Sequence, residues 1–458
     1  RVIALTACTS HVYDLGGLGM GPDGSDVFDE GLYLPPMKLV DRGEVNALII
    51  EIMKANSRSP LANEGDFYAL MACCDVAASR LAKMLEEFCL ENIEALAAHI
   101  IDTSRKATET AIDAIPDGIY DSELETDGYD FDIRLRASMR VTGKRITTDF
   151  AGSSGPSARG INVPIKYTEA YAAFALRCLI GSRVPNNAGS LAPFEFVAPQ
   201  DCILNAQYPA PVAMRHCPGQ MLADLMFGCV HQAMPNTAPA EGASCLYDLP
   251  LRSVAANGHG SAGTAFATEL CHSGGMGARP DQDGLSATAY PSGLWGTPVE
   301  ITETTTPLRI RRRELICDSG GAGRQRGGLG QRIELESSEG APLLLFAGVE
   351  RMKFPARGRA GGHSGAAGRG TLRSGALIRA KGEQLIPADD LLIWQTPGGG
   401  GYGDPRERDP AAVLRALKSG FFSPRAVTEI YGVVLDTDGS LDEAATAAQR
   451  ERLLAGAA

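Results

Sequence analysis

Residues 131–150 read FDIRLRASMRVTGKRITTDF, and this stretch decides the class of fold. Apolar and polar side chains alternate on both sides of the pair Gly143-Lys144, as in two half-buried strands joined by a tight turn. The alternating positions are Phe131, Ile133, Leu135, Met139, Val141, Ile146, Thr148 and Phe150. The stretch therefore predicts a β-hairpin with one face in a core.

Helical patterns lie on both sides of this hairpin. Before it, helices are predicted over 44–56 and 64–112, the second with a break near Asn92. In the longer one, apolar residues at steps of three and four predict a helix hairpin that buries Phe67, Leu70, Leu81 and Phe88. After the hairpin, helices are predicted over 168–180, 411–419, 424–431 and 442–456.

Helices and strands cluster along the chain rather than alternate, which argues against a doubly wound parallel sheet. We therefore predict an α+β (mixed α/β) fold, with a β-rich body, helical insertions and a small helical C-terminal region. Its four parts are a metal-loop segment 1–42, a helical insertion 43–125, a β-rich body 126–405 and a helical C-terminal cap 406–458.

Composition narrows the classes of partner. The 458 residues include 43 Lys and Arg against 55 Asp and Glu, a formal net charge of −12. Nucleic acid binding needs a concentrated positive surface, so it is not expected. No run of about 18 apolar residues can span a bilayer, and no basic-then-apolar leader opens the sequence. We expect a cytoplasmic protein without a nucleic acid or membrane partner.

The first seven residues, RVIALTA, form an apolar run typical of a buried strand already under way. Because a chain rarely begins within a strand, we expect a further N-terminal part, either removed from this chain or supplied by a separate one.

A candidate metal-binding pair follows that run. His11 and Asp14 stand in the sequence HVYDLGG, where Gly16 and Gly17 let the backbone turn so that imidazole and carboxylate can converge. A catalytic divalent metal takes about three protein ligands and an open water position. Further ligands must therefore come from Asp29, Glu30 or the N-terminal part. The alternative is that no metal binds here, because a surface His beside an Asp in a turn would give the same spacing.

Three glycine-rich blocks could approach a ligand closely. They are Gly274–Pro280, Asp318–Gly330 and Pro397–Gly403. Arg279 in the first block is a candidate contact for phosphate or carboxylate, and Arg324 and Arg326 have a similar setting. Tight turns between strands explain these glycines equally well. The segment around His216 (MRHCPG) is interpreted as packing rather than as part of a pocket.

Ten short motifs lie in one order along nearly the whole chain. They are HVYDLGG at His11, EGLYLPPMKL at Glu30, NSRSP at Asn56, DFAGSS at Asp149, INVP at Ile161, PNNAGSLAP at Pro185, GGMGARPDQDG at Gly274, TPVE at Thr297, DSGGAGRQRGGLG at Asp318 and TPGGGGYGDP at Thr396. Together they resemble the hydantoinase B family, which includes the N-methylhydantoinase B subunit, the matching part of 5-oxoprolinase and a subunit of acetone and acetophenone carboxylases.

This resemblance implies a two-part enzyme. A separate hydantoinase A-type, actin-like ATPase subunit phosphorylates the oxygen of a small-molecule substrate, and the hydantoinase B-type subunit completes the reaction at a divalent metal, Zn or Mn. The absence of GxxxxGK[ST] from this chain is consistent with ATP being bound by the partner. The family's HxxD ligands correspond to His11 and Asp14. Because the family pattern extends further N-terminally, other ligands are expected from that segment.

Three functions follow from the resemblance. The first is the metal-bearing subunit of an ATP-dependent cyclic amide hydrolase, acting on a hydantoin, oxoproline or lactam, with Arg279 orienting the phosphorylated group. The second is a subunit of an ATP-dependent ketone carboxylase of acetone or acetophenone type. The third is a noncatalytic scaffold in such a hetero-oligomer.

Overall fold

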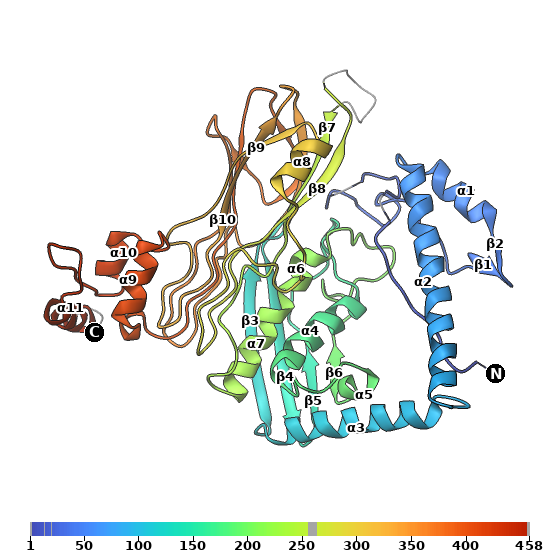
Figure 1. Cartoon of the computed structure of the whole chain (residues 1–458), viewed down its shortest axis with the longest axis horizontal. Coiled ribbons are helices and arrows are strands. Elements are labelled where there is room, and N and C mark those ends of the chain that lie inside the picture. The colour runs from blue at the N-terminus through green and yellow to red at the C-terminus, as the bar shows by residue number, and fades with distance from the viewer. Residues whose placement is uncertain (1, 13, 20, 255–262, 456–458) are drawn as a thin grey trace.

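The predicted hairpin is present in the computed structural model, which describes residues 2–12, 14–19, 21–254 and 263–455 (Figure 1). It forms part of a four-stranded sheet ordered β3 (Gly118–Thr126), β4 (Ile133–Thr142), β5 (Arg145–Asp149) and β6 (Phe194–Val197). The turn between β4 and β5 places Gly143 at φ +56°, a conformation that glycine adopts without steric cost. Strands β3, β4 and β5 pair antiparallel, and β6 pairs parallel with β5.

Except for Thr126, strand β3 lies within the segment 43–125 that we predicted to be a helical insertion. Its inward-facing side chains are Tyr120, Ser122, Leu124 and Thr126, so the apolar alternation is weak. Pairing with β4 over nine residue pairs, from Gly118 with Val141 to Thr126 with Ile133, makes it a strand despite this.

Helices cover this sheet and complete its core. α4 (Ile165–Leu179) confirms the helix predicted over 168–180, and it packs with α7 (Leu222–Ala233), which lies on β3 and β4. The short helices α5 (Ala188–Leu191) and α6 (His216–Gln220) lie nearby, α5 against α3 (Glu94–Asp113). The side chains between sheet and helices are fully buried, among them Leu135, Met139, Leu176, Leu225 and Val230.

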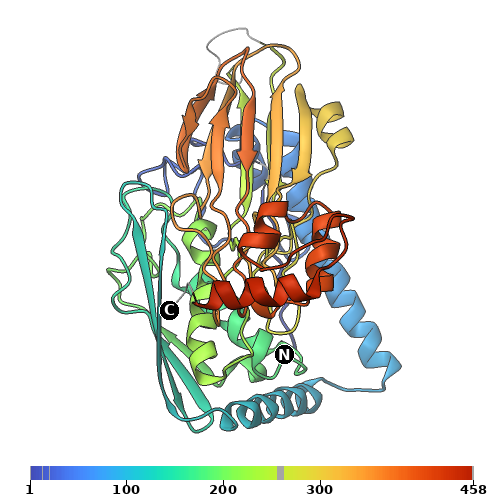
Figure 2. The same cartoon turned by 90° about the vertical axis from the view of Figure 1, so that its left-hand side faces the viewer.

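Two further sheets pack face to face above this layer (Figure 2). One is ordered β14 (Lys381–Ile386), β11 (Leu343–Gly348), β7 (Tyr247–Ser253) and β8 (Ala267–His272). The other is ordered β13 (Leu377–Ile378), β12 (Arg369–Leu372), β15 (Leu392–Gln395), β10 (Gln331–Ser337) and β9 (Leu308–Leu315), with α8 (Val299–Thr305) beside β9. Their shared core contains Tyr247, Leu345, Ile333 and Trp394.

The three glycine-rich blocks form neither a set of separate turns nor an open loop. They run side by side as extended segments beneath the two-sheet part (Figure 1). Gly275 N donates to Pro397 O at 2.9 Å, Gly328 N to Met276 O at 2.8 Å, and Gly399 N to Gly328 O at 3.0 Å. Backbones approach this closely only because the residues lack side chains. We call this arrangement the glycine bundle, built from 274–280, 318–330 and 397–403.

A buried ion pair connects the lower sheet with the two-sheet part. Lys381 Nζ lies 2.9 Å from Glu350 Oε1, and the two side chains are 3% and 0% exposed. The hydroxyl of Thr126, at the end of β3, donates to the other carboxylate oxygen of Glu350. Burial raises the pKa of Glu350 to about 7, and the neighbouring ammonium opposes this rise.

Replacing Lys381 with Met should leave the Glu350 carboxylate buried without its cation, at a cost of about 3–5 kcal/mol in unfolding free energy. The folded-state pKa of Glu350 then moves further above the unfolded value of about 4.3. Because the folded state binds the extra proton, stability should fall as pH rises from about 5 to 8. Urea unfolding at both pH values tests this, and adding Glu350→Gln should recover much of the loss. A Lys381→Met variant as stable as wild type at pH 8 would contradict the assignment.

The N-terminal region differs most from prediction. Residues 2–7 form no strand, and Val2 and Leu5 are exposed, because no described strand lies beside them. Two short paired strands, β1 (Val40–Asp41) and β2 (Glu44–Val45), precede α1 (Ala47–Ala55). The predicted long helical stretch is divided at the expected place into α2 (Pro60–Glu87) and α3.

The expected helix hairpin is wrong. Figure 1 shows α2 and α3 meeting at a corner, with α2 standing beside the body. Phe67, Leu70 and Leu81 are only half-buried, and Phe88 is 64% exposed. The apolar face of α2 is therefore only partly buried by the residues that the structure describes.

The helical C-terminal region is present as predicted. After a single 3-10 turn (Pro405–Glu407) come α9 (Pro410–Lys418), α10 (Pro424–Glu429) and α11 (Glu443–Ala455). Asp409 and Ser423 cap the first two by accepting from the backbone N–H groups of Ala411 and Ala426. None of the helices in the described part of the chain combines the length and apolar character that a membrane crossing requires.

Candidate functional site

The loop that contains His11 and Asp14 is folded tightly against the end of α1. Gly16 and Gly17 both have positive φ, +77° and +59°. A methyl group on Gly16 would lie 2.7 Å from the carbonyl oxygen of Asn56, and one on Gly17 would lie 2.5 Å from that of Asp29. The two glycines that the sequence pattern singled out are therefore required by both the turn and the close approach.

Asp14 is held by a dense set of donors. Its Oδ1 accepts from the backbone N–H of Gly16 at 3.0 Å and from Arg58 Nη1 at 2.9 Å, and its Oδ2 accepts from the backbone N–H of Arg58. The Asn63 side chain bonds the backbone N–H and C=O of Asp14. The carboxylate is 12% exposed, whereas the Arg58 side chain is 50% exposed. A fixed anion is thus paired with a half-exposed guanidinium group, whose Nη2 also donates to the carbonyl oxygen of Gly17 at 2.7 Å.

His11 and Asp14 line the same cavity, whose volume is about 360 Å³. Its opposite wall comes from β7, β8 and β11, which contribute Leu251, Arg252, Thr268, Glu269 and Phe346. Arg58, Ser59 and Asp66 contribute from the start of α2 and the residues before it. The size is that of a small-molecule binding site. The structure therefore brings together the two predicted metal ligands.

Charges of both signs face this cavity. Asp14, Asp66 and Glu269 supply carboxylates, and Arg58 and Arg252 supply guanidinium groups. Arg252 packs over the ring of Phe346, with its guanidinium carbon 4.5 Å from the ring centroid. Its Nε has no hydrogen-bond partner within the described part of the chain, and its Nη2 lies 3.8 Å from Glu383. Imidazole and carboxylates suit a divalent cation, and Arg252 suits an anion.

A comparison with models of protein families shows which family this chain belongs to. The model described as hydantoinase B/oxoprolinase matches residues 1–405. This chain belongs to the hydantoinase B/oxoprolinase family.

Individual relatives agree with this membership. The hydantoinase B-type chain is 29% identical to the caprolactamase subunit beta of Pseudomonas jessenii, over 98% of its own length and 80% of that protein. The crystal structure of the ATP-dependent caprolactamase from the same organism superposes with a TM-score of 0.84 at 26% identity, over 96% of this chain and 79% of that one. Nucleotide-free acetone carboxylase shares the fold, with a TM-score of 0.79 at 19% identity over 98% and 67%.

The relatives of this chain therefore include an ATP-dependent caprolactamase, and the match to its structure confirms the α+β fold predicted for this hydantoinase B-type chain. The description of the matching family model agrees with the resemblance that the ten motifs indicated.

Arg279 lies apart from the cavity in this hydantoinase B-type chain. It belongs to the glycine bundle, where its Nη2 donates to the carbonyl oxygen of Asp283 at 3.1 Å, and it is absent from the cavity lining. Arg326 is buried in the same bundle, where Asp283 receives two hydrogen bonds from Arg408 at 2.7 Å each. Of the arginines, Arg58 and Arg252 line the cavity, and Arg279, which we predicted to contact an anion, does not.

Asp29 and Glu30 were predicted as possible further metal ligands. Their carboxylates instead accept hydrogen bonds that hold the loop in place. Asp29 accepts from the N–H and the hydroxyl of Ser25, which lowers its pKa. Glu30 Oε1 accepts from the backbone N–H groups of Val212 and Ala213 at 2.5 and 2.7 Å. Neither lines the cavity. Both side chains tie the metal-loop segment to itself and to the body.

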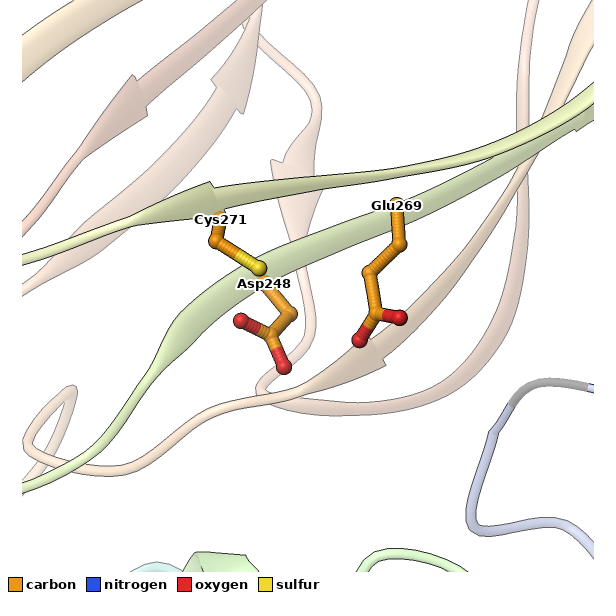
Figure 3. A group of neighbouring side chains, drawn as sticks. All are labelled: Asp248, Glu269 and Cys271. Carbon is orange, nitrogen blue, oxygen red and sulfur yellow. The ribbon is translucent and has the colours of Figure 1, made fainter. Parts of the chain in front are cut away.

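A second group of polar side chains lies beside the cavity (Figure 3). Asp248 on β7 and Glu269 and Cys271 on β8 point to the same side of the sheet, and their ligand atoms lie within 4.8 Å of one another. His216 Nε2 lies 3.7 Å from Asp248 Oδ2. Burial raises the pKa of Asp248 to about 7. Glu269 belongs both to this group and to the cavity lining.

Proposed function

We propose that this chain is the metal-bearing subunit of an ATP-dependent cyclic amide hydrolase, acting on a hydantoin, oxoproline or lactam that a partner ATPase subunit has phosphorylated. The supporting observation is the cavity where His11 and Asp14 meet Glu269 and Arg252. It offers ligands for a cation and a guanidinium group for an anion within one space of a size that suits a small molecule.

His11 and Asp14 would hold a divalent cation, Zn or Mn. The fit rests on donor chemistry, since an imidazole and a carboxylate face one cavity with Asp66 and Glu269 on its other walls. Asp14 already faces a cation, the Arg58 guanidinium at 2.9 Å, and a metal would have to displace this half-exposed side chain from Asp14.

The chemistry requires an activated carbonyl, because resonance protects an amide carbon from water. Phosphorylation of the carbonyl oxygen by the partner would make the carbonyl carbon electrophilic. Water would add to that carbon, the ring C–N bond would break as the nitrogen takes a proton and leaves, and a second water would hydrolyse the resulting acyl phosphate to carboxylate and phosphate. A divalent cation, when bound, lowers the pKa of its coordinated water toward roughly 7. In this chain, Arg252 would hold the phosphoryl oxygens, while Leu251 and Phe346 would pack against the ring and exclude bulk water. Arg279 would act only in an arrangement that brings the glycine bundle to the substrate.

A ketone carboxylase is the second candidate, and the shared fold with acetone carboxylase supports it. A phosphorylated enol would occupy the same cavity and meet carbon dioxide there. Both reactions use an anion contact and a cation.

Turnover by the full chain with its partner ATPase distinguishes these candidates. We expect ring opening of hydantoin, 5-oxoproline or caprolactam that requires ATP and does not respond to bicarbonate. Product that forms from acetone or acetophenone only when bicarbonate is present would establish the carboxylase instead. Absence of both products from a complex that hydrolyses ATP would leave the chain as a noncatalytic scaffold and contradict the proposal.

A further inference from the structure

The side chains in Figure 3 form a compact set of metal-type ligands on two paired strands. Asp248 is directly opposite Cys271 in the β7–β8 pairing, and Glu269 pairs with Pro250. Residues two apart on a strand share a face, so Glu269, Cys271 and Asp248 all project from one side of the sheet. His216 approaches the same carboxylate from α6, with its Nε2 at 3.7 Å from Asp248 Oδ2.

These ligand atoms are close to the spacing that a metal requires. Around a tetrahedral zinc ion, bound at roughly 2.0–2.3 Å, neighbouring ligand atoms lie roughly 3.3–3.8 Å apart. The His216 and Asp248 atoms already satisfy this spacing at 3.7 Å. The atoms of Asp248, Glu269 and Cys271, all within 4.8 Å of one another, need to move by about 1 Å, which is within reach of small side-chain rotations.

The ion pair with His216 leaves the other oxygen of the Asp248 carboxylate unpaired within the described part of the chain. Asp248 is 2% exposed, and its Oδ1 has no hydrogen-bond partner among the residues described. Within the same residues, no Lys or Arg forms an ion pair with Asp248 or Glu269. A buried carboxylate oxygen without a donor is costly, and the exposed Glu269 carboxylate beside it adds a like charge. A bound cation would remove both costs.

We propose that His216, Asp248, Glu269 and Cys271 form a second divalent-cation site, distinct from the one assigned to His11 and Asp14. The combination of imidazole, thiolate and carboxylates selects zinc or cobalt over magnesium or calcium, which prefer oxygen ligands alone. Glu269 also lines the cavity, so the site borders the place where the substrate would bind. The site stands on its own contacts and does not depend on the proposed hydrolase activity.

Cobalt titration of the metal-stripped full chain, in complex with its partner, tests this site directly. A Co²⁺–thiolate bond gives a charge-transfer absorption in the near ultraviolet that nitrogen and oxygen ligands do not produce. We expect this absorption in the wild type and its loss in Cys271→Ser. The isosteric Asp248→Asn variant should weaken cobalt binding by about 100-fold or more, since even changes beyond the direct ligands cost 10–100-fold.

Two controls separate this site from the others. Cys317→Ser removes an exposed thiol elsewhere in the chain and should keep the absorption. His11→Ala should also keep it, because that residue belongs to the first proposed site, so the failure of one assignment does not imply failure of the other. A wild-type complex without thiolate absorption at saturating cobalt, or an unchanged spectrum in Cys271→Ser, would overturn the second site and leave two carboxylates that share a proton.

Discussion

His11→Ala should lower the rate of cyclic amide ring opening by about a thousandfold or more, while the partner subunit continues to hydrolyse ATP. The imidazole lines the cavity together with Asp14, and losing it would remove a ligand from a site that already shows few others. A metal contributes several kcal/mol to such a reaction, and each 1.4 kcal/mol changes the rate about tenfold. Steady-state product formation and phosphate release, measured on the same complex, give the two rates.

A matched histidine provides the control for that experiment. His99 lies on α3 with its side chain exposed, outside the cavity lining. His99→Ala should retain both activities, so a parallel loss in the two variants would indicate general damage. Full ring-opening activity in His11→Ala would contradict the role proposed for His11.

Gly328→Ala should abolish stable folding of the body. A methyl group at this position would lie 2.0 Å from Leu285 O and 2.7 Å from Met276 N, both backbone atoms that cannot rotate away. Inserting a carbon into a well-packed interior costs about 1–3 kcal/mol, and a clash with fixed backbone on two sides should cost at least the upper end. We expect a lower thermal midpoint or a loss of soluble protein, measured by circular dichroism and by recovery after expression.

Gly65→Ala is the corresponding control. Gly65 lies in α2 with nothing within 4 Å of the added methyl group. Alanine is favoured over glycine in a helix by about 1 kcal/mol, so this variant should be as stable as wild type or slightly more stable. Wild-type stability of Gly328→Ala would contradict the close backbone packing described for the glycine bundle.

Sequence patterns predicted correctly those strands and helices that are determined by residues close together in the chain. The alternation around Gly143 predicted β4 and β5, and three-residue and four-residue steps predicted α4 and the division of 64–112 near Asn92. The run at 2–7 has the same apolar character, but no described strand pairs with it. A strand needs a partner, and a sequence pattern does not identify that partner.

The same limit applies to the candidate site. The HxxD spacing and the two glycines pointed to His11 and Asp14, because those residues lie within one loop. Arg252 and Glu269 face them only because β7 and β8 lie across the cavity, and neither residue carries a local signal. We predicted that Arg279 contacts an anion because glycines surround it. Those glycines instead allow the backbone to pack closely against 318–330 and 397–403. His216 was interpreted as packing, and its carboxylate neighbour on β7 is 32 positions away.

The position of the cation tests the account most directly. Crystals of the full chain with its partner, measured at the absorption edge of the bound metal, should show an anomalous peak within bonding distance of the His11 imidazole and the Asp14 carboxylate, with Arg58 displaced. A saturated crystal with no peak in that cavity, with Arg58 still paired to Asp14, would contradict it, even if a peak appeared beside Cys271.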